Sequence, residues 1–144
     1  MSRRKSRIIA FQAIYSWDVS GESLDNLTQF SWVDSKENLD ESELTFSRLL
    51  IAGTIENIEK VDELIKSHLS ENWSFDRLNK VTLSILRISI YSLVFQKEIA
   101  PSIVIDEAIS IAKEFGPQDS FKFINAMLDK ISKEQSYIFI LKSN

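Results

Sequence analysis

Residues 78–94 limit the possible folds of this chain more than any other part of the sequence. Their apolar side chains recur at every angle around a helix instead of forming one stripe. A helix that is apolar all round is stable only when neighbouring elements cover all of its faces. The segment therefore predicts a central helix, capped by Ser74 and reaching about Phe95, around which the other elements pack.

Arg87 is the one charged side chain between Val81 and Val94. A buried guanidinium requires a carboxylate or several carbonyl oxygens, because an uncompensated charge is costly away from water. We therefore expect an intramolecular ion pair at Arg87.

The rest of the chain is also predicted to be helical. With three Gly and two Pro among 144 residues, the sequence signals few turns. Apolar residues at helical spacing predict further helices over about residues 4–18, 24–33, 103–115 and 119–131, and a long helix that reaches Leu69 from a cap at Asp40 or Ser42. The predicted architecture is an all-α bundle of about six to seven helices. It forms a single domain over residues 1–144, with two packed sub-bundles of about 1–70 and 71–134.

Two glycines and the end of the chain support more local predictions. Gly53 lies within the long helix, where it costs about 1 kcal/mol relative to Ala, so we expect a close helix crossing there. Gly116 and Pro117 end the preceding helix, with Gly116 in the left-handed closing position, and Asp119 caps the last one. Residues 137–141 form a short apolar run that continues the last helix, packs back on the body or covers a partner surface. Residues 135–144 are therefore a tail of unassigned role.

Positive charge is concentrated at the N-terminus. Arg3, Arg4, Lys5 and Arg7 are the four charged residues among the first seven, and all are basic. Residues 8–144 hold 13 basic against 21 acidic residues, so the body is acidic. On a helix Arg3 and Arg7 share a face, where their repulsion persists unless an anion meets them. The segment is either a solvated basic tail or a phosphate-binding helix end, and it would bind nucleic acid through a local patch.

Several classes of site are disfavoured. Without Cys the chain has no disulfide and no thiolate metal site, and its one histidine, His68, cannot form a multi-histidine site. A Gly-rich phosphate loop is absent. No apolar run reaches the roughly 18 residues of a membrane span, and the N-terminus lacks the features of a signal peptide. We expect no catalytic residues, no metal and no cofactor, in a cytoplasmic protein.

Residues 115–125 are the best candidate for a second binding surface. They form a tight turn followed by the start of a helix, where free backbone N–H groups attract anions. Lys113 and Lys122 add positive charge. Phe121 and Phe123 are two residues apart and cannot both face the core, so we expect Phe123 to be exposed or half exposed. Exposed aromatic rings beside cations suit stacking on bases of single-stranded RNA, and a core aromatic pair around the turn is the alternative.

Four blocks of the sequence resemble, in order, the NusB-type transcription antitermination factors. They are residues 3–17, Leu86-Arg-Ile-Ser-Ile-Tyr91, residues 101–116 and residues 119–129. Their order and spacing over residues 3 to about 131 are specific to that family. The resemblance implies an all-α fold of two packed bundles and a protein without catalytic activity.

The resemblance also implies partners. These are boxA-type single-stranded RNA, the small-subunit ribosomal protein NusE, bound jointly with the RNA, and the RNA polymerase antitermination complex, which reads through terminators in ribosomal RNA operons. The family's RNA contacts correspond here to Arg3, Arg4, Arg7, Phe115, Gly116, Asp119, Lys122 and Phe123. Tyr15 matches a family tyrosine at the surface for the ribosomal protein.

The sequence departs from the family pattern at a few positions. Asp106 replaces a usual Asn, Ala126 replaces a usual Gly, and Thr82 stands where an acidic partner contact is expected. Two other functions stay open. One is the RNA-binding helical domain of a ribosomal RNA cytosine methyltransferase, which requires a further cofactor-binding domain. The other is a helical protein–protein adaptor without a role in RNA binding.

Overall fold

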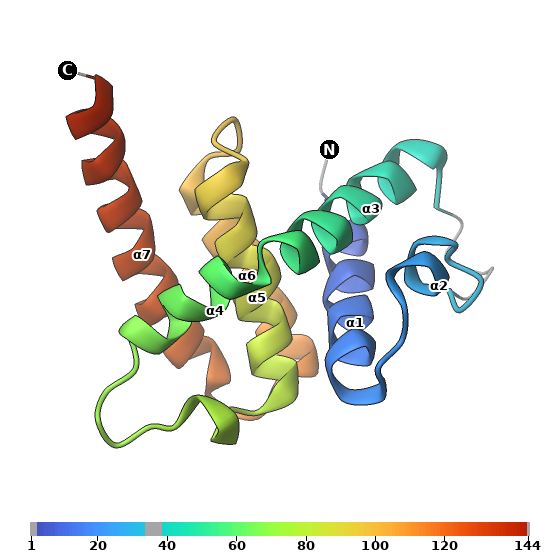
Figure 1. Ribbon diagram of the computed structural model, residues 1–144, viewed down its shortest axis with the longest axis horizontal. Helices are drawn as coiled ribbons and strands as arrows, with labels where there is room; N and C mark the ends of the chain where they lie inside the picture. Colours follow the sequence, from blue (N-terminus) through green and yellow to red (C-terminus); the bar gives the residue numbers. More distant parts are fainter. Residues whose placement is uncertain (1–2, 34–38, 144) are drawn as a thin grey trace.

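The computed structural model describes residues 3–33 and 39–143, and these residues confirm the predicted all-α fold (Figure 1). Residues 34–38, in a polar and acidic stretch from which the sequence predicts a loop over residues 34–43, lie outside the described part. The described residues form seven α-helices and one 3-10 helix: α1 (Arg4–Ser20), α2 (Leu24–Thr28), α3 (Glu41–Glu56), α4 (Ile58–Ser67), η2 (Phe75–Arg77), α5 (Lys80–Phe95), α6 (Pro101–Phe115) and α7 (Ser120–Ser143).

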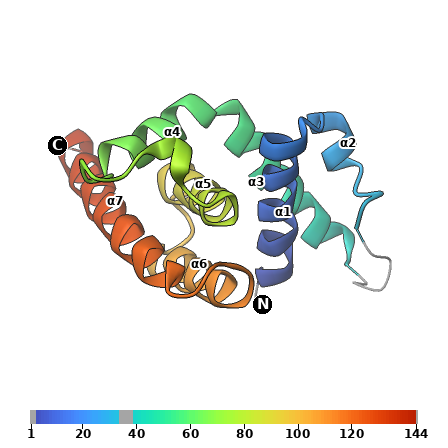
Figure 2. The same cartoon turned by 90° about the horizontal axis from the view of Figure 1, so that it is seen from below.

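Helix α5 is the central element, as its all-round apolar pattern predicted. Every residue from Thr82 to Leu93 is buried. Viewed from below, α5 lies inside a ring made by α1, α3, α4, α6 and α7 (Figure 2), and each of these helices contacts it. The arrangement of these five helices therefore follows from the need to cover α5 on all sides.

The start of α5 differs from the prediction. Ser74 does not cap it, because residues 75–77 form the 3-10 helix η2 and Leu78 is extended. Asn79 is the cap, and its side-chain oxygen accepts hydrogen bonds from the amides of Val81 and Thr82 at 3.0 Å each. Leu78 belongs to the apolar pattern and is buried, but it reaches the core from outside the helix.

The predicted long helix is two helices, α3 and α4, separated at Asn57. Asn57 has φ −111° and ψ 22°, and its side-chain amide donates to the carbonyl of Gly53 at 2.8 Å. Such local hydrogen bonds compete with the helical ones and favour a break. The apolar stripe continues into α4, where Val61 and Ile65 are buried, so periodicity alone did not reveal the interruption.

Two further helix ends can be compared with the prediction. Helix α3 begins at one of the two predicted caps, and α2 is shorter than predicted. Of the candidates for α3, Asp40 is the cap, and its carboxylate accepts the amide of Glu43 at 2.8 Å. The second helix ends at Thr28 instead of continuing to residue 33, because Phe30 has a left-handed φ of 60°.

The turn between α6 and α7 also corrects the prediction. Gly116 is extended, with φ −87° and ψ 170°, and it is not left-handed. Its lack of a side chain is needed for space, because a Cβ there would meet the hydroxyl of Ser120 and the carbonyl of Ala112. The left-handed residue is Asp119, with φ 67°, and its carbonyl accepts the amide of Lys122 at 3.1 Å in the first turn of α7.

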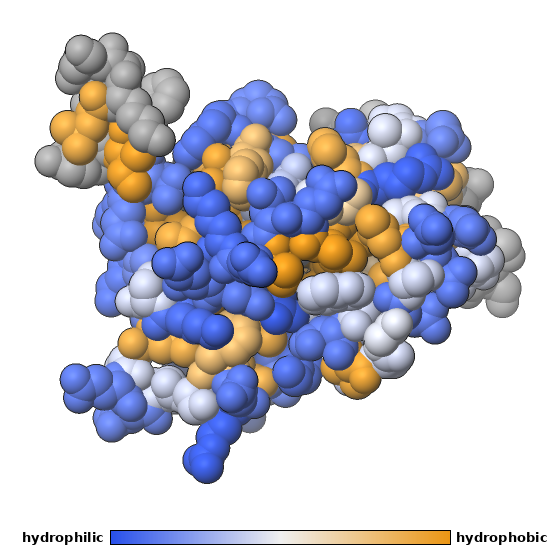
Figure 3. All heavy atoms as spheres, viewed as in Figure 1, coloured by the Kyte–Doolittle hydropathy of each residue, from blue (hydrophilic) through white to orange (hydrophobic). Residues whose placement is uncertain are grey.

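The apolar tail continues the last helix, which is one of the three arrangements that the sequence left open. Helix α7 runs to Ser143, and its end projects beyond the body of the molecule (Figures 1 and 3). Ile138 and Leu141 are exposed on this projection.

A buried arginine joins three helices. Arg87 of α5 donates two hydrogen bonds of 2.9 Å to the carboxylate of Asp62 in α4, and its Nη1 lies 3.1 Å from Asp18 Oδ2 in α1. The rings of Trp17 and Phe75 each lie 5.8 Å from the guanidinium carbon. The expected intramolecular pair is therefore confirmed, with two carboxylates instead of one.

Gly53 marks a close helix crossing, as predicted. It is buried in α3, and a Cβ built on it would overlap the phenol ring of Tyr91 in α5. Burial, the largest cause, raises the pKa of Tyr91, and the negative charges of Glu56 and Glu98 raise it further.

We expect Asp62→Ala to lower the free energy of unfolding by about 3 kcal/mol, because it leaves the Arg87 charge without its bidentate partner. Urea denaturation measures the loss. Asp129→Ala is the matched control, since it breaks an exposed pair with Lys133 and should cost less than about 0.5 kcal/mol. The double variant Arg87→Met/Asp62→Leu should recover most of the loss, and a double variant as unstable as Asp62→Ala would contradict this account.

Gly53→Ala should lower the free energy of unfolding by about 1–3 kcal/mol, because overlap with Tyr91 outweighs the gain in helix propensity. In a Tyr91→Leu background, which removes the overlapping ring atoms, the same change should be neutral or stabilising. An equal loss in both backgrounds, measured by urea denaturation, would show that the crossing is not the cause.

Candidate nucleic-acid interface

Two of the predicted RNA-binding arginines are placed by the first turn of α1 and held by other helices. Arg3 donates to the carbonyl and hydroxyl of Ser42 at 3.3 and 3.1 Å, so it leans toward α3. Arg4 leans toward α6, where it donates to the Glu107 carboxylate at 3.0 Å and the Ser110 hydroxyl at 3.3 Å. The N-terminal end of α1 is therefore an ordered, positively charged end of the bundle.

Arg7 is placed differently, because only 5% of its surface is exposed. Its guanidinium carbon lies 5.3 Å from the ring centroid of Phe46, and that of Arg3 lies 4.9 Å from the same ring. Burial, the largest cause, lowers the pKa of Arg7, the negative charge of Glu107 opposes this shift, and the positive charge of Arg3 adds to it. Arg3 and Arg7 thus share one face, as their spacing predicted, but the face packs on an aromatic ring.

The structure brings Phe115 to the outer face of α1. Its ring, at the end of α6, is 38% exposed and lies 5.3 Å from the ring of Phe11. Beside it is a hollow lined by Lys5, Ile8, Ile9, Gln12, Trp32, Val33, Glu114 and Phe115. An exposed cation, an amide and two aromatic rings thus surround one depression.

Lys5, Gln12 and Trp32 were not singled out as site residues from the sequence. For Lys5 and Gln12 a signal was present, since they lie seven residues apart on one helical face. For Trp32 there was none, because it approaches α1 from the segment after α2. Its indole donates to the carbonyl of Leu27 at 2.9 Å, which holds the ring at the hollow.

The turn after α6 brings together two of the remaining predicted residues, Asp119 and Lys122. Lys122 is exposed, with its ammonium 3.8 Å from the carboxylate of Asp119. The ammonium groups of Lys113 and Lys122 lie 4.7 and 6.0 Å from the ring centroid of Phe121. Phe121 and Phe123 are both half-buried and both pack against the core. The expected half exposure of Phe123 is therefore confirmed, but the expected contrast with Phe121 is not.

Tyr15 lies further along the same outer face of α1 and is 37% exposed. It lines a second hollow with Phe11, Gln12, Ser16, Trp32 and Val81. Gln12 and Trp32 border both hollows, so the two depressions are neighbours. The position that lacks the expected acid, Thr82, is buried, and its neighbour Val81 faces this hollow.

His68 lies at the end of α4, where its Nδ1 is 3.0 Å from the hydroxyl of the neighbouring Ser67. That nitrogen lies 2.7 Å from the carbonyl of Leu64, and Nε2 lies 2.9 Å from the Glu134 carboxylate. The Ser67 hydroxyl itself donates to the Leu64 carbonyl at 2.9 Å. Both ring nitrogens therefore face acceptor oxygens, and the contact with Glu134 links the end of α4 to α7.

Within residues 3–33 and 39–143, no group of three or more His, Asp or Glu side chains is placed to hold a metal ion. The helices in this described part are also too short or too polar to cross a membrane.

The chain is similar to known proteins over almost its whole length. The family model described as the NusB family matches residues 4–133. The transcription antitermination protein NusB of Treponema denticola is 49% identical over 134 residues, which cover 93% of this chain and 98% of that protein.

Solved structures agree with this similarity. A structure of T. maritima NusB is 37% identical with a TM-score of 0.81, and the match covers 93% of this chain and 92% of that one. A chain from a crystal structure of the antitermination factors NusB and NusE in complex with dsRNA is 29% identical with a TM-score of 0.80, covering 93% and 99% of the two chains. The chain described here therefore belongs to the NusB family.

Proposed function

We propose that this protein is a transcription antitermination factor that binds boxA-type single-stranded RNA together with the ribosomal protein NusE. In that role it promotes read-through by RNA polymerase in ribosomal RNA operons. The observation that carries the proposal is the match, over nearly the full chain, to a structure of antitermination factors NusB and NusE in complex with dsRNA. The preference for a single strand rests on the resemblance of the sequence to the family and on the partly exposed aromatic rings described below. The relative at 49% identity, which is named as an antitermination protein, supports it.

The proposed RNA surface has a cationic part and an aromatic part. Arg4 and Lys122 supply exposed positive charge for phosphates, and Arg3 supplies a half-buried one. Arg7 is buried, so it adds positive charge beneath the surface and does not contact phosphates directly. Its guanidinium also packs on the ring of Phe46. Charged contacts of this kind give salt-dependent affinity without sequence information.

The aromatic part supplies the contacts to bases. Phe115 and Phe123 offer partly exposed rings on which unpaired bases stack. Gly116 and Asp119 shape the turn between the two rings, Gly116 by leaving space for Ser120 and Asp119 by its left-handed backbone. This arrangement suits a single strand better than a duplex, whose bases are already stacked on one another.

Tyr15 belongs to the proposed surface for the ribosomal protein. Its hollow is mainly apolar, with Phe11, Trp32 and Val81 in its lining, as the core of a protein–protein contact requires. We further propose that the protein is non-catalytic, needs no cofactor and acts in the cytoplasm. The names of the relatives favour this function over that of a ribosomal RNA methyltransferase domain.

Binding of a boxA oligomer should weaken with salt. If about four phosphates are neutralised on a single strand, the slope of log K against log salt should be about −3. The triple variant Arg3→Gln/Arg4→Gln/Lys122→Gln should flatten the slope to about −1. Fluorescence anisotropy of labelled RNA measures both slopes.

The matched control is Lys60→Gln/Lys97→Gln/Lys133→Gln. It removes the same charge at exposed positions away from the proposed surface, so it should leave the slope near that of the unaltered protein. Binding that does not exceed that of a scrambled oligomer would refute the proposed function, and an equal effect of the two triple variants would refute the proposed surface.

Tyr15→Ala should weaken binding of the ribosomal protein by about tenfold, because it removes a partly exposed aromatic ring from an apolar contact. RNA affinity without the partner should not change, whereas the extra affinity gained with the partner should fall. Val19→Ala is the control on the same helix, since Val19 is exposed and does not line the hollow. Isothermal titration with each ligand, alone and together, separates these effects. Unchanged partner affinity of Tyr15→Ala would contradict the assignment.

A further inference from the structure

Trp73 is an exposed aromatic side chain that the proposed function does not use. It lies in the segment between α4 and η2 and is 57% exposed. Its ring centroid lies 5.9 Å from that of Phe123, with 32° between the ring planes. Trp73 therefore adjoins one of the two rings proposed to stack on RNA bases.

Trp73 is exposed although contacts with the body fix the chain on both sides of it. On one side, His68 Nε2 lies 2.9 Å from the Glu134 carboxylate in α7. On the other side, the ring of Phe75 lies 4.9 Å from the Lys66 ammonium, and Leu78 is buried. The backbone on both sides is held to the body, yet the largest apolar side chain of the segment stays at the surface.

We propose that Trp73 extends the RNA surface and stacks on the unpaired base next to the one at Phe123. This inference rests on the proposed function and names a further base-binding residue for it. Phe123 adjoins the indole of Trp73, and more than half of the surface of Trp73 stays open to solvent. Successive bases of a single strand stack on neighbouring aromatic side chains in this way, with little dependence on sequence.

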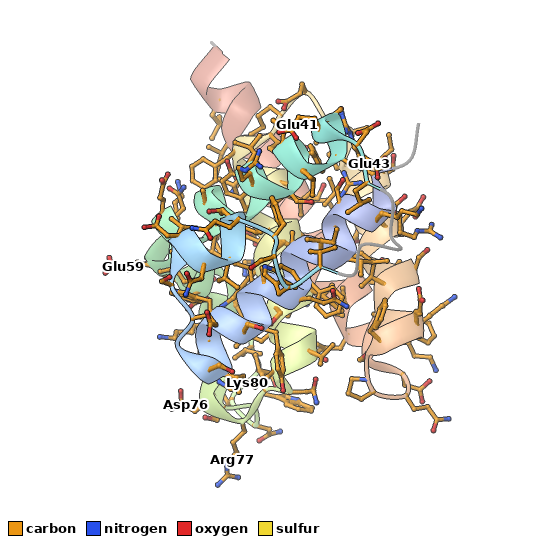
Figure 4. All side chains as sticks on the ribbon, turned by 90° about the vertical axis from the view of Figure 1, so that its right-hand side faces the viewer. Glu41, Glu43, Glu59, Asp76, Arg77 and Lys80 are labelled. Atoms are coloured by element: carbon orange, nitrogen blue, oxygen red, sulfur yellow. The ribbon has the colours of Figure 1, made fainter. Side chains whose placement is uncertain are left out.

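The charges near Trp73 indicate what kind of contact it makes. The segment of residues 70–79 contains Glu71, Asp76 and Arg77, so it has no net positive charge to attract phosphates. Arg77 extends away from the body at the lower edge of the molecule (Figure 4). Trp73 therefore contributes affinity through its ring, and this contribution depends little on salt.

Trp73→Leu should weaken binding of boxA RNA by about tenfold at every salt concentration and leave the salt slope unchanged. Lys122→Gln, in contrast, should flatten the slope by about 0.7. Phe95→Leu is the matched control, because Phe95 is an exposed ring beside another aromatic ring, Tyr91, and a cation, Lys60. Phe95 is the last residue of α5, whereas Trp73 precedes the start of that helix. The change Phe95→Leu should therefore leave RNA affinity unchanged.

A second measurement reports on the indole directly. In Trp17→Phe/Trp32→Phe, Trp73 is the remaining tryptophan, and a stacked base should quench its fluorescence as RNA is added. The inference is overturned if the unaltered protein binds boxA RNA while Trp73→Leu binds equally well and the fluorescence does not change. If the unaltered protein does not bind boxA RNA above a scrambled oligomer, the proposed function fails and this inference fails with it.

Discussion

The fold depends on how one buried guanidinium is neutralised. Helix α5 is apolar on every side, so hydrophobic burial alone would tolerate several rotations of it about its own axis. The contacts of Arg87 with Asp62 and Asp18 have direction, and they are satisfied when α4 and α1 approach one particular side. The cost of leaving this charge unpaired makes the other rotations unfavourable. The ion pair thus specifies the packing that burial stabilises.

The pairing of Arg87 also fixes the position of α1, which borders the two proposed binding surfaces. Asp18 holds its last turn against α5, and Ile9, Ala10 and Ile14 are buried along its inner side. Its outer face borders both hollows, and its first turn holds the arginines. A single rigid helix therefore sets the spacing between the proposed RNA surface and the proposed protein surface. Two ligands placed on such a frame can contact each other without any change in its shape, which is a simple physical basis for joint binding.

Much of the fold could be predicted from periodicity and capping residues. The apolar pattern predicted the burial of α5, and Gly21, with φ 71°, closes α1 close to its predicted end. The errors occurred where local hydrogen bonds or backbone conformations compete. Asn57 breaks a helix whose apolar stripe continues, Asn79 caps α5 in place of Ser74, and Asp119 takes the left-handed conformation expected of Gly116. Periodicity cannot detect such positions, because each changes one or two residues without shifting the apolar pattern.

The sequence by itself determined the helical class, the central helix and the family, and it predicted part of the proposed site, without Lys5, Gln12, Trp32 or Trp73. The helical class and the central helix depend on the local spacing of apolar residues. The family depends on the order of four sequence motifs along one chain. Only the tertiary structure decided which carboxylates neutralise Arg87, that Arg7 is buried against Phe46, and that Trp73 lies beside Phe123. These contacts join residues far apart in the sequence, and no local pattern encodes them. They arise because close packing of the other helices around α5 and against one another leaves each side chain a single set of neighbours.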